Sequence, residues 1–230
     1  MSESSQIPRF HRRPEARPEE LVEAALTVFS ERGFRQTTLE EVAQRAGVSK
    51  GTVYLYFASK DALFEAVVEK KVIALLESAE AMARAHAGTA TEVLVDVVKS
   101  MWESMSQTDM VCMARLVQGE LRHFPEVRRF YFDHVVVRHR RLLSDIAERG
   151  VASGEFRAEA LVILPRMVPS LVMKLNQTQY EFGDLDHDAP PASVMRDLIL
   201  TLVLDGICTP AAGATCQLIP GESAAGRKKE

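Results

Sequence analysis

Apolar residues recur every three or four positions along most of the chain, the spacing that gathers them on one face of an α-helix. In the first periodic segment Leu21, Ala25 and Phe29 share such a face. Gly33 follows that segment and is predicted to end its helix. No segment alternates strictly between apolar and polar residues over the length of a strand. The pattern therefore predicts an all-α fold.

Capping signals divide the next part of the chain into short helices. Thr38 and Glu41 have the spacing of a capping box, in which each side chain bonds a backbone N–H of the other residue. The helix that they begin is predicted to stop at Gly47. Ser49 then caps a second short helix, which is expected to run to Phe57.

A longer helix is predicted to begin at Lys60, after the cap residue Ser59, and to continue beyond residue 70. The breaks that follow contain glycine, proline or clusters of polar residues. Between these breaks, helices are predicted over residues 89–106, 109–121, 125–150, 158–182 and 191–208.

The two ends of the chain differ in composition from this helical body. Residues 1–17 are polar and rich in arginine, and we expect them to form a flexible basic arm. Residues 209–230 are rich in alanine and glycine and end in a basic run, which predicts a disordered tail. The body itself is expected to form a small domain, 18–64, and a larger one, 65–208.

Charge is distributed unevenly along the chain. The net charge of −4 does not by itself indicate a nucleic-acid-binding protein. The first 60 residues carry 9 Lys and Arg against 8 Asp and Glu, whereas the remainder carries 19 against 24. Four of the nine basic residues lie in the arm: Arg9, Arg12, Arg13 and Arg17. They could enter a minor groove or follow phosphates, or they could remain solvated, and the sequence leaves both alternatives open.

Composition excludes several classes of protein. The chain is 47% hydrophobic and 26% charged, has no apolar run long enough to span a membrane and begins without an apolar signal segment, so a cytoplasmic location is expected. The three cysteines lack metal-ligand spacing, and His134 and His139 are five residues apart, so we expect reduced thiols, no metal and no cofactor. No nucleophile elbow, HExxH or paired-carboxylate motif is present, so no catalytic residue is predicted.

The stretch RAGVSKGTVYLYFASKDAL, residues 45–63, holds two glycines and two lysines, as a phosphate-binding loop would. A P-loop needs a preceding strand and the sequence GK[ST] after its second glycine, and this stretch has neither. The spacing fits a helix-turn-helix better. Ala43 is small where two helices touch, Gly47 can take the positive φ of the turn, and Val48 and Val53 are inward anchors. The second helix then presents these residues outward, toward a major groove: Lys50, Gly51, Thr52, Tyr54 and Leu55.

The segment TTLEEVAQRAGVSKGTVYLYFASKDALFEAV, with the preceding LVEAALTVFSERGF, resembles the DNA-binding domain of the TetR family of bacterial transcriptional regulators. The resemblance covers residues 18–68 and follows the family pattern essentially throughout. Beyond residue 88 only the general layout is similar. The resemblance implies an N-terminal three-helix helix-turn-helix domain and a C-terminal helical ligand-binding and dimerisation domain. It also implies a ligand-responsive regulator of double-stranded operator DNA, most often a repressor.

Residues are predicted to contact DNA in two ways. Phosphate contacts are expected from Thr38, Tyr54, Tyr56 and Lys60, the last because it resembles the family's phosphate-binding lysine. Contacts in or near the groove are expected from Ser49, Lys50, Gly51, Thr52 and Leu55.

A homodimer is expected because two such modules, about 34 Å apart, are needed to read a palindromic operator. The helices near 158–182 and 191–208 are the candidates for its interface. The second is apolar on nearly all faces, so that a partner could cover one side of it. The alternative is a helix buried deep in a monomer core.

Methionine and aromatic residues of the larger domain suit an adaptable cavity for a small apolar effector. The predicted contacts are Trp102, Met105, Met113, Phe130 and Met173, with Asn176, Gln177 and Tyr180 as polar partners. Each of these residues could instead pack the core, and the polar three could bond across a dimer. A DNA-binding regulator without a ligand, or an activator, remains the alternative function. A C-terminal domain without a cavity would favour the regulator without a ligand.

Overall fold

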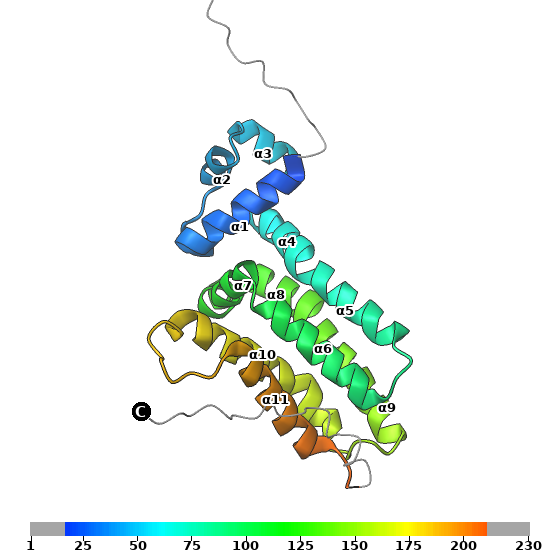
Figure 1. Ribbon diagram of the computed structural model, residues 1–230. Helices are drawn as coiled ribbons and strands as arrows, with labels where there is room; N and C mark the ends of the chain where they lie inside the picture. The colour runs from blue at the N-terminus through cyan, green and yellow to red at the C-terminus, as the bar shows by residue number, and fades with distance from the viewer. Residues whose placement is uncertain (1–16, 211–230) are drawn as a thin grey trace, which may run out of the picture. The chain divides into compact units, whose positions relative to one another are not determined.

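The computed structural model describes residues 17–210, and these residues are almost entirely helical (Figure 1). Within them the sole β contact is an isolated bridge between Phe156 and Cys208, so the predicted all-α fold is confirmed. Cys208 is also held in a disulfide, which the expectation of reduced thiols did not include. The predicted arm before residue 17 and the tail beyond residue 210 lie outside the described residues.

The chain divides into two compact units that meet between Val67 and Val68, slightly beyond the boundary predicted after residue 64. Four helices form the N-terminal unit: α1 (Arg17–Gln36), α2 (Leu39–Arg45), α3 (Lys50–Tyr56) and α4 (Lys60–Val68). Its centre is a cluster of three phenylalanine rings. The ring centre of Phe34 lies 5.4 Å from that of Phe29 and 5.4 Å from that of Phe64. The ring centres of Phe29 and Phe64 are 6.1 Å apart.

Gly33 lies inside α1 and has φ 79 and ψ 165, values that no helical residue adopts. The helix predicted to end at Gly33 is therefore interrupted there. Only glycine takes this conformation without steric cost. The interruption turns the chain so that Phe34 enters the core, where it is fully buried.

The C-terminal unit contains seven α-helices among its described residues: α5 (Ala74–Ala85), α6 (Ala90–Met105), α7 (Thr108–Gly119), the short α8 (Pro125–Tyr131), α9 (Val137–Ala152), α10 (Ala160–Phe182) and α11 (Ala192–Ile207). Three short turns of other helical types accompany them: the π-helical η1 (Glu69–Ile73) and η3 (Phe132–Val136), and the 3₁₀ turn η2 (Leu121–His123). The core lies between α6, α9, α10 and α11 (Figure 1). Among its fully buried side chains are Leu94, Leu143, Leu164 and Leu200.

Glu155 joins the loop before α10 to the beginning of α6. Its carboxylate accepts hydrogen bonds from the backbone N–H of Ala90 at 3.1 Å and of Thr91 at 3.0 Å, and from the Thr91 hydroxyl at 2.9 Å. The first N–H groups of a helix have no acceptor within the helix. The Glu155 side chain supplies that acceptor from a point 64 positions away in the sequence.

Candidate functional site

The turn between α2 and α3 has the geometry of a helix-turn-helix. Gly47 has φ +65, the left-handed conformation predicted for it. The N–H of Val48 donates to the carbonyl of Ala43 at 2.9 Å and closes the end of α2. Ser49 then starts α3, because its hydroxyl accepts a hydrogen bond from the backbone N–H of Thr52 at 3.2 Å. Local hydrogen bonds therefore fix both the end of one helix and the start of the next.

Helix α3 has one buried side and one exposed side. Val53 is fully buried, as expected for an anchor, whereas Leu55 is 77% exposed and Tyr54 is exposed. The other predicted contact residues of this helix are Lys50 and Gly51, which are exposed, and Thr52 and Tyr56, which are partly buried. A Cβ atom added at Gly51 would have only the Ser49 hydroxyl oxygen nearby, at 3.8 Å, so packing leaves room for a side chain there.

Lys50 does not extend freely from α3. Its ammonium pairs with the carboxylate of Glu40 on α2 and lies 5.6 Å from the centre of the Tyr54 ring. The hydrogen bond to Glu40 raises the pKa of Lys50, and the same bond lowers the pKa of Glu40. Because both side chains are exposed, this pair can open when a stronger anion approaches Lys50.

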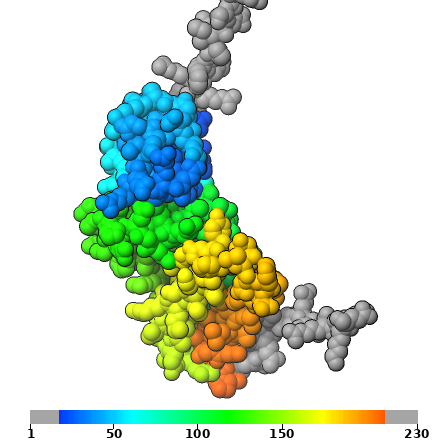
Figure 2. Space-filling model, turned by 90° about the vertical axis from the view of Figure 1, so that its left-hand side faces the viewer, coloured from blue at the N-terminus to red at the C-terminus, as the bar shows by residue number. Residues whose placement is uncertain are grey.

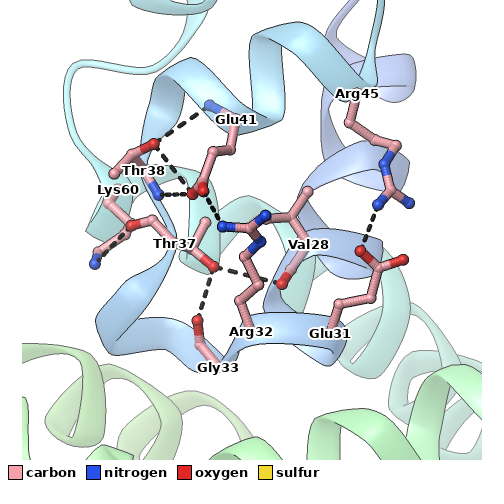
Figure 3. A network of polar contacts seen from close by, with 9 residues as sticks. All are labelled: Val28, Glu31, Arg32, Gly33, Thr37, Thr38, Glu41, Arg45 and Lys60. Atoms are coloured by element: carbon pink, nitrogen blue, oxygen red, sulfur yellow. Dashed lines mark hydrogen bonds and ion pairs between the residues drawn. The ribbon is translucent and has the colours of Figure 1, made fainter.

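The start of α2 carries the predicted capping box (Figure 3). The Thr38 hydroxyl accepts from the Glu41 N–H at 3.3 Å, and the Glu41 carboxylate accepts from the Thr38 N–H at 2.9 Å. Arg32 also donates to Glu41, at 2.5 Å, and ties α1 to α2. The hydrogen bond from the Thr38 backbone is the main cause that lowers the pKa of Glu41. Thr38 is thus committed to capping in this structure, and its contact with phosphate stays a prediction.

Lys60 bonds backbone carbonyls in this structure, and its contact with DNA phosphate stays a prediction. Its ammonium donates to the carbonyl oxygens of Phe34, Arg35 and Thr37, at 2.6, 3.2 and 3.0 Å. Figure 3 draws the bond to Thr37. An ammonium group has three N–H donors, and here three carbonyls take them. The geometry therefore makes Lys60 a structural contact at the end of α1, and phosphate would have to displace one of these carbonyls.

The C-terminal unit contains a partly open cavity of about 240 Å³. Two predicted ligand contacts, Met105 and Met173, line it. Further apolar lining comes from α5, α6, α7 and α10 and from both π-helical turns. Pro165 and Pro169 lie inside α10 and face the same space, and each removes one N–H from the hydrogen bonds of that helix.

Six predicted ligand contacts do not line this cavity. Trp102 and Met113 are buried in the packed interior, as the alternative of core packing stated. Phe130 stacks on the exposed ring of His134, with ring centres 4.5 Å apart, and Tyr180 is exposed on α10. The remaining two are Asn176 and Gln177, which are buried in α10.

The amide of Asn176 already has protein partners. Its oxygen accepts from the Ser106 hydroxyl at 2.7 Å and its nitrogen donates to the Val172 carbonyl at 3.0 Å. Gln177 donates to Glu181 at 3.1 Å. The bond from Ser106 holds α10 to the end of α6, whereas the other two bonds lie within α10. Neither amide faces the cavity.

Sequence reasoning missed the polar residues that do face the cavity. Tyr131 and His139 line it from the helical segment that runs through α8, η3 and α9, and Arg140 and Arg166 line it from exposed positions. The signal was weak, because these residues lie among other basic and aromatic residues and only the three-dimensional packing separates the inward side chains from the outward ones.

The part of the chain that the structure describes holds neither a metal-binding cluster nor a membrane-spanning helix. Within residues 17–210 no group of three or more His, Cys, Asp or Glu side chains is placed to hold a metal ion. No helix in that part of the chain has the length and apolar character needed to cross a membrane.

Family models match both units. The model described as "Bacterial regulatory proteins, tetR family" matches residues 21–67, and the model described as "AefR-like transcriptional repressor, C-terminal domain" matches residues 92–162. The first range contains α2, the turn and α3.

Individual relatives agree with these matches. The fatty acid metabolism regulator protein of Bacillus subtilis (strain 168) is 26% identical over 188 residues, which are 82% of this chain and 94% of that protein. The HTH-type transcriptional repressor KstR2 of Rhodococcus jostii (strain RHA1) is 28% identical over 197 residues, 83% of this chain and 91% of that protein. The crystal structure of FadR from Bacillus subtilis in complex with stearoyl-CoA has a similar fold, with a TM-score of 0.69 and 22% identity over 82% of this chain and 98% of that one.

These relatives are regulators, which confirms the prediction of a transcriptional regulator and not an enzyme. The helix-turn-helix geometry of α2 and α3 and the matches over both units agree with one another. The chain belongs to the TetR family of bacterial transcriptional regulators.

Proposed function

We propose that this regulator is a cytoplasmic homodimeric repressor that binds a palindromic operator through α3 and is released by a small, largely apolar effector. In this proposal two copies of α3 enter adjacent major grooves about one helical turn apart. The observation that carries it is the exposed side of a firmly capped α3, on which an exposed aromatic and an exposed leucine stand beside Lys50 and Gly51. Apolar and basic side chains exposed together on one side of a helix suit contact with a DNA groove.

A second surface supports the dimer. Exposed large hydrophobic residues gather on α10 and α11: Leu161, Val162, Met167, Tyr180, Phe182, Val194, Leu198 and Leu202. The two helices adjoin on the C-terminal unit, where Figure 2 colours them yellow-green to orange. Exposed apolar surface of this extent marks an interface in soluble proteins. A second copy of the chain would cover it, and two helices from each copy would then form a four-helix bundle.

The cavity supports an effector. Its volume of about 240 Å³ and its methionine-rich lining favour a small apolar ligand over the alternative of a regulator without one. A protein of similar fold was solved with stearoyl-CoA, which carries a long apolar chain on a charged coenzyme A group, so a ligand with an apolar part has a precedent in this fold. The effector changes operator affinity only by binding the two conformations of the dimer differently.

Footprinting of the purified full-length protein on DNA from its own genome tests the DNA-binding part of the proposal. We expect protection of two inverted half-sites, with centres one helical turn apart, and loss of that protection in Leu55→Ala. Binding only at the strength seen for unrelated DNA would contradict the proposal.

Transcription from the protected promoter in a cell-free system then decides between repression and activation, since a repressor lowers the transcript level and an activator raises it.

A further inference from the structure

Two polar side chains face the largely apolar cavity from the same segment of chain, in addition to three serines and two exposed arginines. Tyr131 ends α8 and His139 lies in the first turn of α9, and both line the cavity. Between them runs the π-helical turn η3. A π turn carries one residue more than an α-helical turn, so eight sequence positions here correspond to about seven in a regular helix, close to two full turns. The π turn therefore places Tyr131 and His139 on one side of the helix.

The hydrogen bond of His139 fixes which of its nitrogens faces a ligand as an acceptor. Its Nδ1 lies 3.1 Å from the carbonyl oxygen of Val135, which can only accept, so Nδ1 carries the proton. Burial lowers the pKa of His139, although Glu80 nearby opposes the effect and Arg138 adds to it. The ring is therefore neutral at neutral pH, and its Nε2 has a free lone pair.

Tyr131 supplies the opposite kind of group. Burial raises the pKa of Tyr131 to about 12, so its phenol remains a neutral O–H donor. Within residues 17–210 neither the Tyr131 hydroxyl nor the His139 Nε2 has a hydrogen-bond partner. The cavity is partly open and both groups are accessible from it, so this donor and this acceptor are available to bond a third group.

We propose that Tyr131 and His139 are the polar anchor of the effector cavity and select an apolar molecule that carries one alcohol group. An alcohol oxygen accepts from the Tyr131 hydroxyl while its proton goes to Nε2 of His139, so one group satisfies both side chains. A ketone satisfies the tyrosine alone. A carboxylate has no proton to donate to Nε2 of His139 and would bind instead to the exposed Arg140 and Arg166. The inference rests on the proposed function, since it names the ligand class of that cavity.

The cavity also sets the size of the ligand. A volume of about 240 Å³ holds about eight groups of the size of water, at roughly 30 Å³ each. The matched probes are accordingly 1-octanol, 2-octanone and octanoate. We expect the affinity of the full-length protein, measured by titration calorimetry without DNA, to fall in that order.

Variants assign the binding to the anchor. Tyr131→Phe removes only the hydroxyl and should weaken 1-octanol about tenfold, the effect of one lost hydrogen bond. His139→Leu should weaken 1-octanol similarly, whereas His134→Leu, at an exposed histidine, should not.

Two results would overturn the inference. One is equal binding of 1-octanol by the wild type and Tyr131→Phe, whose folding is checked by its unfolding temperature. The other is tighter binding of octanoate than of 1-octanol, with loss in Arg166→Gln, which would assign the ligand to the exposed arginines. Because no DNA is present, failure to bind an operator would contradict the proposed function and leave this measurement valid.

Discussion

The ammonium nitrogen of Lys60 lies 2.6 Å from the carbonyl oxygen of Phe34 and 4.7 Å from the centre of the same residue's ring. The carbonyls of Arg35 and Thr37 complete its set of acceptors. Carbonyls at the end of a helix lack N–H partners and carry partial negative charge. The ammonium of Lys60, at the start of α4, thus holds the end of α1 and lies against a ring of the phenylalanine cluster.

Lys60→Met keeps most of the stem and removes the charge. It leaves three carbonyls without their donor, and we expect the N-terminal unit to lose about 1–3 kcal/mol of stability. Urea unfolding followed by circular dichroism measures the loss. Lys50→Met, on the exposed side of α3, is the control and should change stability little. Unchanged stability of Lys60→Met with weaker DNA binding would instead support the phosphate contact first predicted.

Lys60 also shows where sequence reasoning stops. The capping box at Thr38 and the left-handed turn at Gly47 were predicted correctly, because each depends on residues within a few positions of it. The exposed side of α3 followed from helical periodicity. The acceptors of Lys60, however, lie more than twenty positions earlier, and the sequence does not tell which helix end they meet.

The same limit explains the cavity. Methionines and aromatics were chosen as contacts by type, but Trp102 and Met113 point into packed core while Met105 and Met173 reach the cavity. Methionine and aromatic residues occur both in packed cores and in apolar binding sites, so residue type does not distinguish the two. Which of these side chains faces the cavity depends on the packing of several helices at once, and no local pattern encodes that.

The ion pair between Lys50 and Glu40 predicts that Glu40→Gln strengthens DNA binding. The substitution removes a negative charge beside α3 and releases the Lys50 ammonium for phosphate or a base. We expect operator affinity to rise several-fold, and the slope of log K against log salt to steepen by up to about 0.9, the value of one more phosphate contact. Fluorescence anisotropy at several salt concentrations measures both quantities. An unchanged slope would mean that Lys50 stays away from the DNA backbone.

A substitution at Gly51 is expected to change protein stability and operator affinity in opposite directions. Its surroundings leave room for a Cβ, and alanine in a helix is more stable than glycine by about 0.5–1 kcal/mol. Gly51→Ala should therefore stabilise the protein and yet weaken operator binding, if the backbone of α3 approaches the groove closely. Gly119→Ala in α7 makes the same change where no atom lies within 4 Å and should leave DNA binding unchanged. Equal operator affinity of Gly51→Ala and wild type would argue against close approach.

Glu155 makes part of the stability dependent on pH. Burial alone would raise the pKa of Glu155, but hydrogen bonds from the Thr91 N–H, the Ser153 hydroxyl and the Ala90 N–H outweigh it and leave the pKa below its ordinary value. A lowered pKa means stability that is present above the unfolded pKa, near 4.3, and is lost as pH falls through the lower folded value.

Glu155→Gln should accordingly cost about 1–2 kcal/mol at pH 7, the effect of a lost helix cap, and much less near pH 3. Unfolding temperatures of both proteins between pH 3 and pH 7 test this. Glu148→Gln, exposed on α9, serves as the control. A difference between Glu155→Gln and wild type that stays constant over that range would show that the carboxylate charge has no part in the cap.

Leu202 gives the sharpest test of the dimer. It is 66% exposed on α11 and lies one turn beyond Leu198, which is also exposed, while the opposite side of α11 is buried in the core. Full burial of a leucine side chain contributes about 1.5–3 kcal/mol of free energy. In a two-fold symmetric dimer both copies of the residue contribute to the interface. Leu202→Glu should therefore yield folded monomers in sedimentation equilibrium, and these should bind a palindromic operator far more weakly because each carries one copy of α3. Leu185→Glu, 71% exposed in the loop between α10 and α11, should remain a dimer. The reverse result, dissociation by Leu185→Glu alone, would place the interface at that loop and away from α11.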